Sequence, residues 1–442
     1  MESEPLIRKS LTSKVFSGVT REAFEESTST ILDIWKGLFV FFMLTEHTRS
    51  SLDVEMSTMY PFMHLVSQVA CALDMTTFST AYGFSCFRSY LFPGVKKRSG
   101  WDTAMRVFRS VGLIYSVAIV CNVLFATQVE GIPPSSGLLW EMASLSTVLW
   151  DFLLTFPLLL LLGALTTGPV LRVVKNKHIY VKLAVFGMLL LWPLVFAQYS
   201  FNISSNSDGS VLDCQSKTGR YAALFVGCSP QTFKATRFPA IPYMFFFNLG
   251  CIASMVLLEF SLTLPSRNQP VHHAGDSSTE AGDEEHESFP MKAYGGFFAS
   301  LVLVEFVFAL PLLINSNEPW ENYDRLLPTL FGSFHYHRFP IYWPLVLGWA
   351  FLSFIALITG ALIWYTFKPL AKLIEGFGAN VLLYFLINVI IIQGFFNDSW
   401  RKARKSQDPD TRKQWELTTV TVSLGTMATT MLVMYLARSA RK

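Results

Sequence analysis

Residues 31–48 read ILDIWKGLFVFFMLTEHT, an apolar run suited to a lipid bilayer that contains four ionisable side chains, Asp33, Lys36, Glu46 and His47. Ionisable groups inside a membrane span are costly, so they mark candidate functional positions. On an α-helix, Lys36 and His47 differ by only about 20° in direction and by roughly 16 Å along the axis. This geometry fits a path for a long anionic molecule. Snorkelling of Lys36 and an interfacial His47 would explain the pair as well.

The composition of the whole chain indicates a membrane protein. Of the 442 residues, 51% are hydrophobic and only 15% are charged, and the mean hydropathy is positive. Apolar runs of about twenty residues, the length that crosses a bilayer, recur along the chain. The net charge of +3 is too small and too spread out to indicate a nucleic-acid partner. We therefore predict an all-α, multi-pass bundle in an endomembrane or the plasma membrane.

Ten membrane spans account for the chain, and the second is long enough to suggest a broken or partly interfacial helix. Lysine and arginine in the loops place both termini in the cytosol, with a polar tail at 1–30, a transmembrane domain at 31–436 and a short tail at 437–442. The spans are expected at 31–49, 62–92, 104–126, 141–165, 179–198, 238–262, 293–315, 340–365, 377–396 and 416–436.

Three connecting segments carry further signals. The predicted luminal loop 198–236 holds a glycosylation sequon at Asn202 and two cysteines, Cys214 and Cys228, which could pair in an oxidising lumen or remain free. The linker 263–292 is polar and is expected to be a disordered cytosolic segment; its histidines could bind a metal, but we predict no metal site. Residues 397–415 are basic yet fall on the luminal side, which disagrees with the charge rule.

Chemistry, if present, should lie in the spans, because the sequence lacks the common phosphate-loop, serine-hydrolase, metalloprotease and paired-cysteine motifs. Arg106 and Arg109 are three positions apart, so both guanidinium groups would share one helix face at the cytosolic entrance. Planar five-donor guanidinium groups suit phosphates. A basic flank at the start of a span gives the same pattern.

Several segments, in order along the chain, resemble the acyltransferase-3 family and its relatives, among them the heparan-glucosaminide N-acetyltransferases. LDIWKG at 32–37 followed by His47 is similar to the family's Leu-Asp-x-x-Arg-Gly…His pattern, with lysine in place of arginine. Arg106 and Arg109 match its Arg-x-x-Arg motif. Three further segments resemble later family motifs, namely FSTAYGF at 78–84, which contains Tyr82 and Gly83, FPAIP at 238–242 followed by Gly250, and GFGANVLLY at 376–384, which contains Asn380.

This resemblance implies a membrane acyltransferase that moves an acyl group, commonly acetyl, from cytosolic acyl-CoA to a hydroxyl or amine, often of a sugar, on the luminal or extracellular side. His47 would be the catalytic residue, as a general base or as an acylated intermediate. Lys36, Arg106 and Arg109 would bind the acyl-CoA donor.

The same resemblance gives supporting positions to Asp33, Tyr82, Gly83 and Asn380, and Asp33 could also pair with Lys36 one turn away. Acyl-CoA would be a substrate and not a permanently bound cofactor, and the acceptor would be a carbohydrate or a lipid-linked molecule. Two other functions fit buried charges in a membrane bundle, a secondary transporter and a catalytically silent scaffold. The sequence departs from the family pattern at three positions, with Lys36 in place of arginine, Tyr82 in place of serine and Asn388 in place of histidine. These differences affect the expected donor binding and activity.

Overall fold

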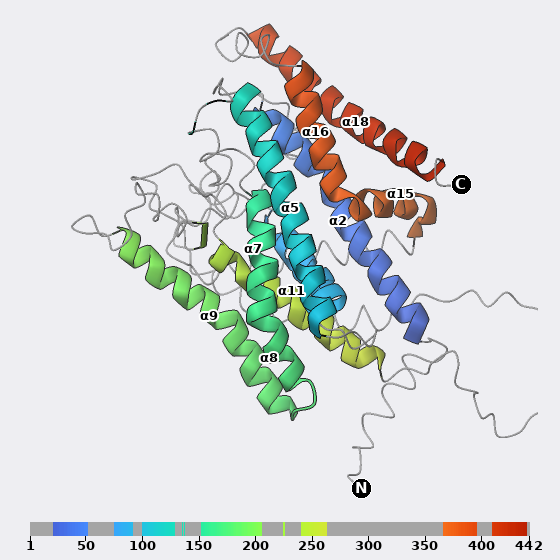
Figure 1. The fold of residues 1–442 in the computed structure, drawn as a ribbon. Helices are drawn as coiled ribbons and strands as arrows, with labels where there is room; N and C mark the ends of the chain where they lie inside the picture. The colour runs from blue at the N-terminus through green and yellow to red at the C-terminus, as the bar shows by residue number, and fades with distance from the viewer. Residues whose placement is uncertain are drawn as a thin grey trace, which may run out of the picture.

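The structure is a computed structural model that describes residues 21–51, 75–91, 100–128, 135, 137, 152–205, 224–225, 240–262, 366–395 and 409–439. Every regular element within these ranges is a helix, and the helices form a bundle (Figure 1). They are α2 (Arg21–Ser51), α4 (Met75–Cys86), the π-helical turn η2 (Phe87–Leu91), α5 (Gly100–Gln128), α7 (Phe152–Leu165), α8 (Thr167–Val174), α9 (Ile179–Ser205), α11 (Ala240–Ser261), α15 (Lys368–Ala379), α16 (Val381–Phe395) and α18 (Pro409–Ser439).

The predicted class, a helical membrane protein, is confirmed in its coarse form. Among the described residues, four helical segments are long and apolar enough to cross a membrane, or five if the bent pair α15 and α16 is one span. The ten-span count and the cytosolic termini stay predictions. The spans predicted at 293–315 and 340–365, the linker 263–292, Cys214, Cys228 and residues 397–408 lie outside the described residues.

Several helices are longer than the spans predicted from hydropathy. Helix α2 begins at Arg21, ten residues before the predicted span, so the end of the predicted N-terminal tail is helical. Helix α9 continues to Ser205, which places the Asn202 sequon in its last turn and not in a loop. Helix α18 begins at Pro409, seven residues before the predicted start. These extensions are more polar than the spans, so a hydropathy window does not detect them.

Two predicted spans are interrupted. The span predicted at 141–165 continues past Thr166 as α8, and the Thr166 hydroxyl donates to the carbonyl oxygen of Leu162 at 2.7 Å. The span predicted at 377–396 is replaced by α15 and α16, which meet at Asn380 with a bend of 70°. The side-chain amide of Asn380 donates to the backbone carbonyl of Gly376 at 3.0 Å. The backbone carbonyl of Asn380 accepts from the backbone amide of Tyr384. Asn380 therefore closes one helix and opens the next.

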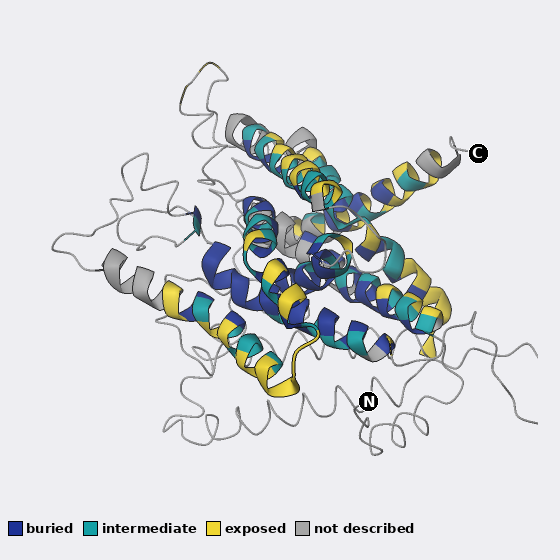
Figure 2. Ribbon diagram, turned by 60° about the horizontal axis from the view of Figure 1, so that its bottom comes forward, coloured by how far each residue is buried: buried dark blue, intermediate teal, exposed yellow. Residues whose placement is uncertain are grey.

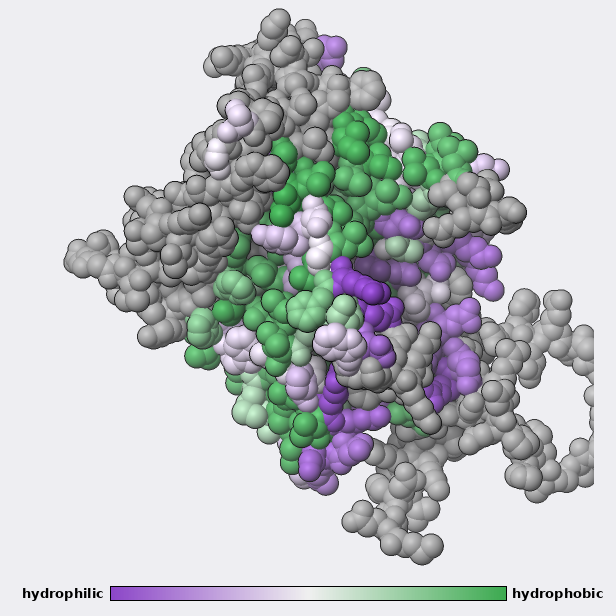
Figure 3. Space-filling view, in the orientation of Figure 1, coloured by the Kyte–Doolittle hydropathy of each residue, from purple (hydrophilic) through white to green (hydrophobic). Residues whose placement is uncertain are grey.

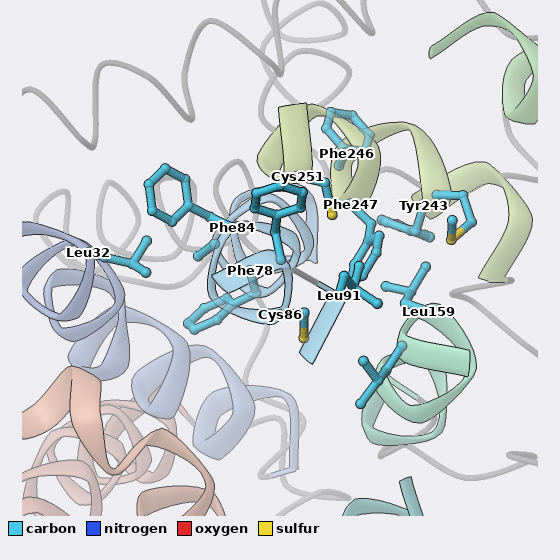
Figure 4. Close-up of a cluster of buried hydrophobic side chains, with 14 of the residues drawn as sticks. Leu32, Phe78, Phe84, Cys86, Leu91, Leu159, Tyr243, Phe246, Phe247 and Cys251 are labelled. Carbon is cyan, nitrogen blue, oxygen red and sulfur yellow. The ribbon is translucent and has the colours of Figure 1, made fainter. Parts of the chain in front are cut away.

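Helices α4 and α11 cross with their backbones in direct contact. A Cβ atom at Gly83 would overlap the carbonyl oxygen of Phe247, and one at Gly250 would overlap that of Thr80. The thiol of Cys251 donates to the Gly83 carbonyl at 3.3 Å. In a membrane, small residues permit this close approach, and van der Waals contact then holds the helices together. Figure 4 shows α11 lying across α4, with Phe247 and Cys251 directed towards it.

A second crossing of the same kind joins α2 to α15. A Cβ atom at Gly37 would overlap the carbonyl oxygen of Ile374, and one at Gly378 would overlap that of Asp33. Both glycines belong to segments that carry the family resemblance. The physical reason for glycine at these positions is therefore helix contact, which requires no chemical role. The buried face of α15 consists of Ala371, Ile374, Phe377 and Gly378.

Polar contacts join several helix ends at one end of the bundle. Ser261, at the end of α11, donates its hydroxyl to Glu25 near the start of α2 at 3.2 Å. Arg172, near the end of α8, donates to the carbonyl of Leu91, the last residue of η2, at 2.7 Å. The ion pair between Lys182 and Glu259, at 2.7 Å, joins the start of α9 to the end of α11.

We call the end of the bundle defined by these contacts the polar end. In Figure 1 the start of α2, the turn between α8 and α9 and the end of α11 lie on its lower side, and Figure 3 shows hydrophilic residues concentrated towards the lower right. Figure 2 shows the buried residues in the central helices and the exposed ones on outward faces. The lysine–arginine rule assigned all of these helix ends to the cytosolic side, so their grouping agrees with the predicted arrangement.

Candidate functional site

Asp33 and Lys36 form an ion pair on α2, with 2.5 Å between the Lys36 Nζ and the Asp33 Oδ1. The pairing expected from their spacing is therefore present. The Lys36 side chain is 21% exposed and the Asp33 side chain is 24% exposed. An ion pair of this kind lowers the cost of placing either charge within a membrane bundle.

Lys36 lies deeper in the bundle than the sequence suggested. Glu25 marks the polar end on α2, and Lys36 is eleven residues further on, roughly 16 Å along the helix. The family resemblance assigned Lys36 to donor binding together with Arg106 and Arg109, which the sequence places at the entrance. The structure places it inside the bundle instead.

His47 lies on the same unbroken helix as Lys36. Because α2 continues from Arg21 to Ser51, the eleven residues between the two positions correspond to about 16 Å of helix. His47 is near the end of α2 that is opposite to the polar end. The axial separation that the sequence predicted for residues 36 and 47 is thus kept along one continuous helix.

Arg106 and Arg109 share α5 but differ in their surroundings. The guanidinium carbon of Arg106 lies 5.7 Å from the centre of the Tyr90 ring, which belongs to η2. The Tyr90 hydroxyl accepts a hydrogen bond from Ser110, one turn after Arg106, at 2.8 Å. Both Arg106 and Arg109 are exposed, and the ring contact with Tyr90 is made by Arg106.

Three of the predicted supporting residues have structural roles. The Tyr82 ring fills the space between α7 and α11, with its centre 5.1 Å from that of Phe156 and 5.9 Å from that of Phe247. Gly83 permits the crossing of α4 and α11. Asn380 forms the corner between α15 and α16. These contacts hold helices of the bundle together and require no contact with a substrate.

Sequence reasoning missed Tyr90, Ser110 and Arg172. Ser110 follows Arg106 by four residues, so helix periodicity could have placed both on one face. Nothing in the sequence marks Tyr90 as their partner. The thiols of Cys86, Cys121 and Cys251 are free but buried, and thiols in apolar surroundings are unreactive. Among the described residues, no group of three or more His, Cys, Asp or Glu side chains could hold a metal ion.

These observations define a helical membrane protein with an internal ion pair and an aromatic-stacked arginine near its polar end. No family model, no curated protein and no solved structure matches the chain. The resemblance to the acyltransferase-3 family therefore stays a prediction, and it enters below only as part of a proposal.

Proposed function

We propose that this protein is a membrane-embedded acyltransferase that moves an acyl group from cytosolic acyl-CoA to a hydroxyl or amine on the luminal or extracellular side. The acceptor is a carbohydrate or a lipid-linked molecule. The observation that carries the proposal is the unbroken helix α2, which links the Asp33–Lys36 ion pair to His47 about 16 Å further along. A helix of this length can carry a donor-binding charge and a catalytic base at separate depths.

The charged groups occur in an order that suits a long donor. Arg106 lies over Tyr90 close to the polar end, and Lys36 lies roughly 16 Å along α2 from Glu25. His47 follows at the far end of α2. The phosphate groups of CoA would bind near Arg106, while the pantetheine arm would extend past Lys36 and bring the thioester towards His47. The length of that arm is comparable to the distance between Lys36 and His47.

The chemistry assigned to His47 is ordinary general-base catalysis. A neutral imidazole takes the proton of the acceptor as its oxygen or nitrogen attacks the thioester carbonyl carbon. The carbon–sulfur bond then breaks, CoA leaves as the thiolate and takes up a proton, and the acylated acceptor departs. In the two-step variant, His47 itself accepts the acyl group before the acceptor does.

The test is acyl transfer by the purified full-length protein in lipid nanodiscs supplied with acetyl-CoA. Release of the CoA thiol, in the presence of candidate sugar acceptors, is the readout. His47→Ala is expected to lower the rate by about a hundredfold or more, the usual contribution of a general base. The matched control is His178→Ala, because His178 is exposed in the turn between α8 and α9. Wild-type turnover in the His47 variant would contradict the proposal.

A second candidate, secondary transport, is favoured by the break at Asn380. Transporters often form their binding sites where membrane helices are discontinuous, and α15 and α16 meet at 70°. Counterflow of a labelled sugar in sealed vesicles, without CoA and independent of His47, would support transport over acyl transfer.

A further inference from the structure

Tyr90 has contacts on both its ring and its hydroxyl, and both involve α5. Its ring lies beneath the guanidinium group of Arg106, 5.7 Å from ring centre to guanidinium carbon. Its hydroxyl accepts from the Ser110 hydroxyl at 2.8 Å. Arg106 and Ser110 are one turn apart on α5, so a single tyrosine side chain contacts two successive turns of that helix.

The π-helical turn gives Tyr90 its place. Helix α4 changes at Phe87 to the wider i→i+5 turn η2, which ends at Leu91. Such a turn shifts the direction of the residues within it relative to the α-helical register, and π-turns are frequent at functional sites. The end of η2 is anchored by Arg172, which donates to the Leu91 carbonyl at 2.7 Å.

Arg106 differs from the ion-paired cations of the bundle in how it is held. Arg21, Lys36 and Lys182 each form an ion pair with a carboxylate, which occupies their charge. Arg106 forms no ion pair with a described carboxylate and lies over an aromatic face, as Arg88 does over the Phe84 ring at 5.5 Å. Arg106 is the exposed one of these two arginines. Stacking on a ring fixes a guanidinium group while its N–H donors, which lie in its own plane, remain available for an anion.

We propose that Tyr90 is a positioning residue that holds Arg106 ready to bind the phosphate groups of the donor. This inference rests on the proposed function, and it assigns the phosphate contact to Arg106 on Tyr90 and not to Lys36. Lys36 is neutralised by Asp33 and lies deeper, where the phosphate-free pantetheine arm would pass. Ser110 contributes by fixing the Tyr90 hydroxyl.

The test compares two donors, acetyl-CoA and S-acetyl-pantetheine, which carries the same thioester without phosphates. The full-length protein in nanodiscs is assayed for KM and kcat with each donor, and CoA binding is measured by titration calorimetry. The variants are Tyr90→Leu, Tyr90→Phe, Ser110→Ala and Arg106→Gln. Lys177→Gln is the control, because it removes an exposed positive charge at the same end of the bundle.

Tyr90→Leu is expected to weaken CoA binding and to raise the KM for acetyl-CoA by roughly three- to tenfold, the size of a cation–π contact. The kcat and the KM for S-acetyl-pantetheine should not change. In the Arg106→Gln background, Tyr90→Leu should add nothing, because the two residues act as one unit. Tyr90→Phe and Ser110→Ala keep the ring and should cause smaller losses, and Lys177→Gln should match wild type.

An equal rise in KM with both donors would overturn the positioning role. So would a further loss of CoA binding when Tyr90→Leu is added to Arg106→Gln. If Tyr90→Leu does not fold, the same comparison is made with Ser110→Ala, for which a donor-independent effect would count against the proposal. Absence of CoA binding by the wild-type protein would overturn both this inference and the proposed function. Wild-type binding that Tyr90→Leu leaves intact would overturn the inference alone.

Discussion

The side-chain amide of Asn248 on α11 donates a hydrogen bond to the carbonyl oxygen of Leu189 on α9 at 2.7 Å. In a regular α-helix this carbonyl would accept from the backbone amide of residue 193, but that residue is proline and has no N–H group. Asn248 therefore supplies the donor that α9 lacks. Its own oxygen accepts from the hydroxyl of Thr167 on α8 at 2.6 Å, so one buried side chain joins three helices.

Replacement of Asn248 by leucine should lower stability by about 1–3 kcal/mol, because it leaves a buried carbonyl and a buried hydroxyl without this partner. In a Pro193→Ala background the loss should be smaller, since the new backbone amide can donate to Leu189. Thermal unfolding in detergent of the two single variants and the double variant measures this coupling. Equal losses in both backgrounds would show that Asn248 does not compensate for the proline.

The crossing of α4 and α11 predicts a strong effect of adding a single methyl group. Gly83→Ala and Gly250→Ala should each destabilise the protein by several kcal/mol or prevent folding, because the new Cβ would overlap a backbone carbonyl. Gly112→Ala is the matched control on α5, where nothing lies within 4 Å of the new atom. The yield of monodisperse protein and its unfolding temperature are the readouts. A Gly83 variant as stable as the Gly112 variant would refute the close crossing.

The ion pair on α2 predicts that charge balance matters more than either charge alone. Asp33→Asn and Lys36→Met should each lower stability by about 1–3 kcal/mol, less than for a fully buried pair because these side chains are 21–24% exposed. The double variant carries no unpaired charge and should be more stable than either single variant. Unfolding temperatures of the three proteins test this. Additive losses would mean that the pair is not coupled.

Lys36 should also affect the donor if the arm of acyl-CoA passes it. Lys36→Met is expected to weaken acyl-CoA binding more than it lowers kcat, whereas Lys36→Arg, which restores the residue typical of the resembling family, should preserve binding. Steady-state kinetics with acetyl-CoA separate the two parameters. An unchanged KM in the methionine variant would remove Lys36 from the donor path. Loss of binding in the arginine variant would instead indicate that Lys36 serves only Asp33.

The proposed mechanism requires Lys177 and Arg49 to face opposite sides of the membrane. A cysteine at Arg49 should react with a membrane-impermeant thiol reagent from the luminal or outer side, and one at Lys177 only after permeabilisation. The three cysteines outside the described residues would first be replaced by serine, since the three within them are buried. Labelling of both positions from the same side would contradict the separation of donor and acceptor.

Hydropathy predicted the helical class and the approximate places of α5 and α11, because a bilayer demands long apolar helices. It could not predict the corner at Asn380, because the uncharged run at residues 377–396 continues through it and reads as one span. It also missed the start of α2 at Arg21, where the helix is stabilised by local polar contacts such as Arg21 with Glu25 at 3.1 Å.

The candidate site was predictable only where a single helix defines it. The relation of Asp33 to Lys36, and of both to His47, follows from helix geometry and needs no tertiary information. The contact of Arg106 with Tyr90 joins two helices, and no pattern in one sequence gives the register between them. The depth of Lys36 likewise depends on a tertiary contact, because the bond of Ser261 to Glu25 fixes which part of α2 lies at the polar end.

The place of the Asp33–Lys36 pair within one helix has a consequence for biosynthesis. The helix that packs on this part of α2 is α15, and Gly378 follows Gly37 by roughly 340 residues. At the usual rate of 5–20 residues per second, a ribosome needs about 20–70 s to make the intervening chain. Throughout this interval α2 has to reside in the membrane without its partner. Because the counter-ion of Lys36 lies one turn away on the same helix, the nascent span enters the lipid with its charge already balanced.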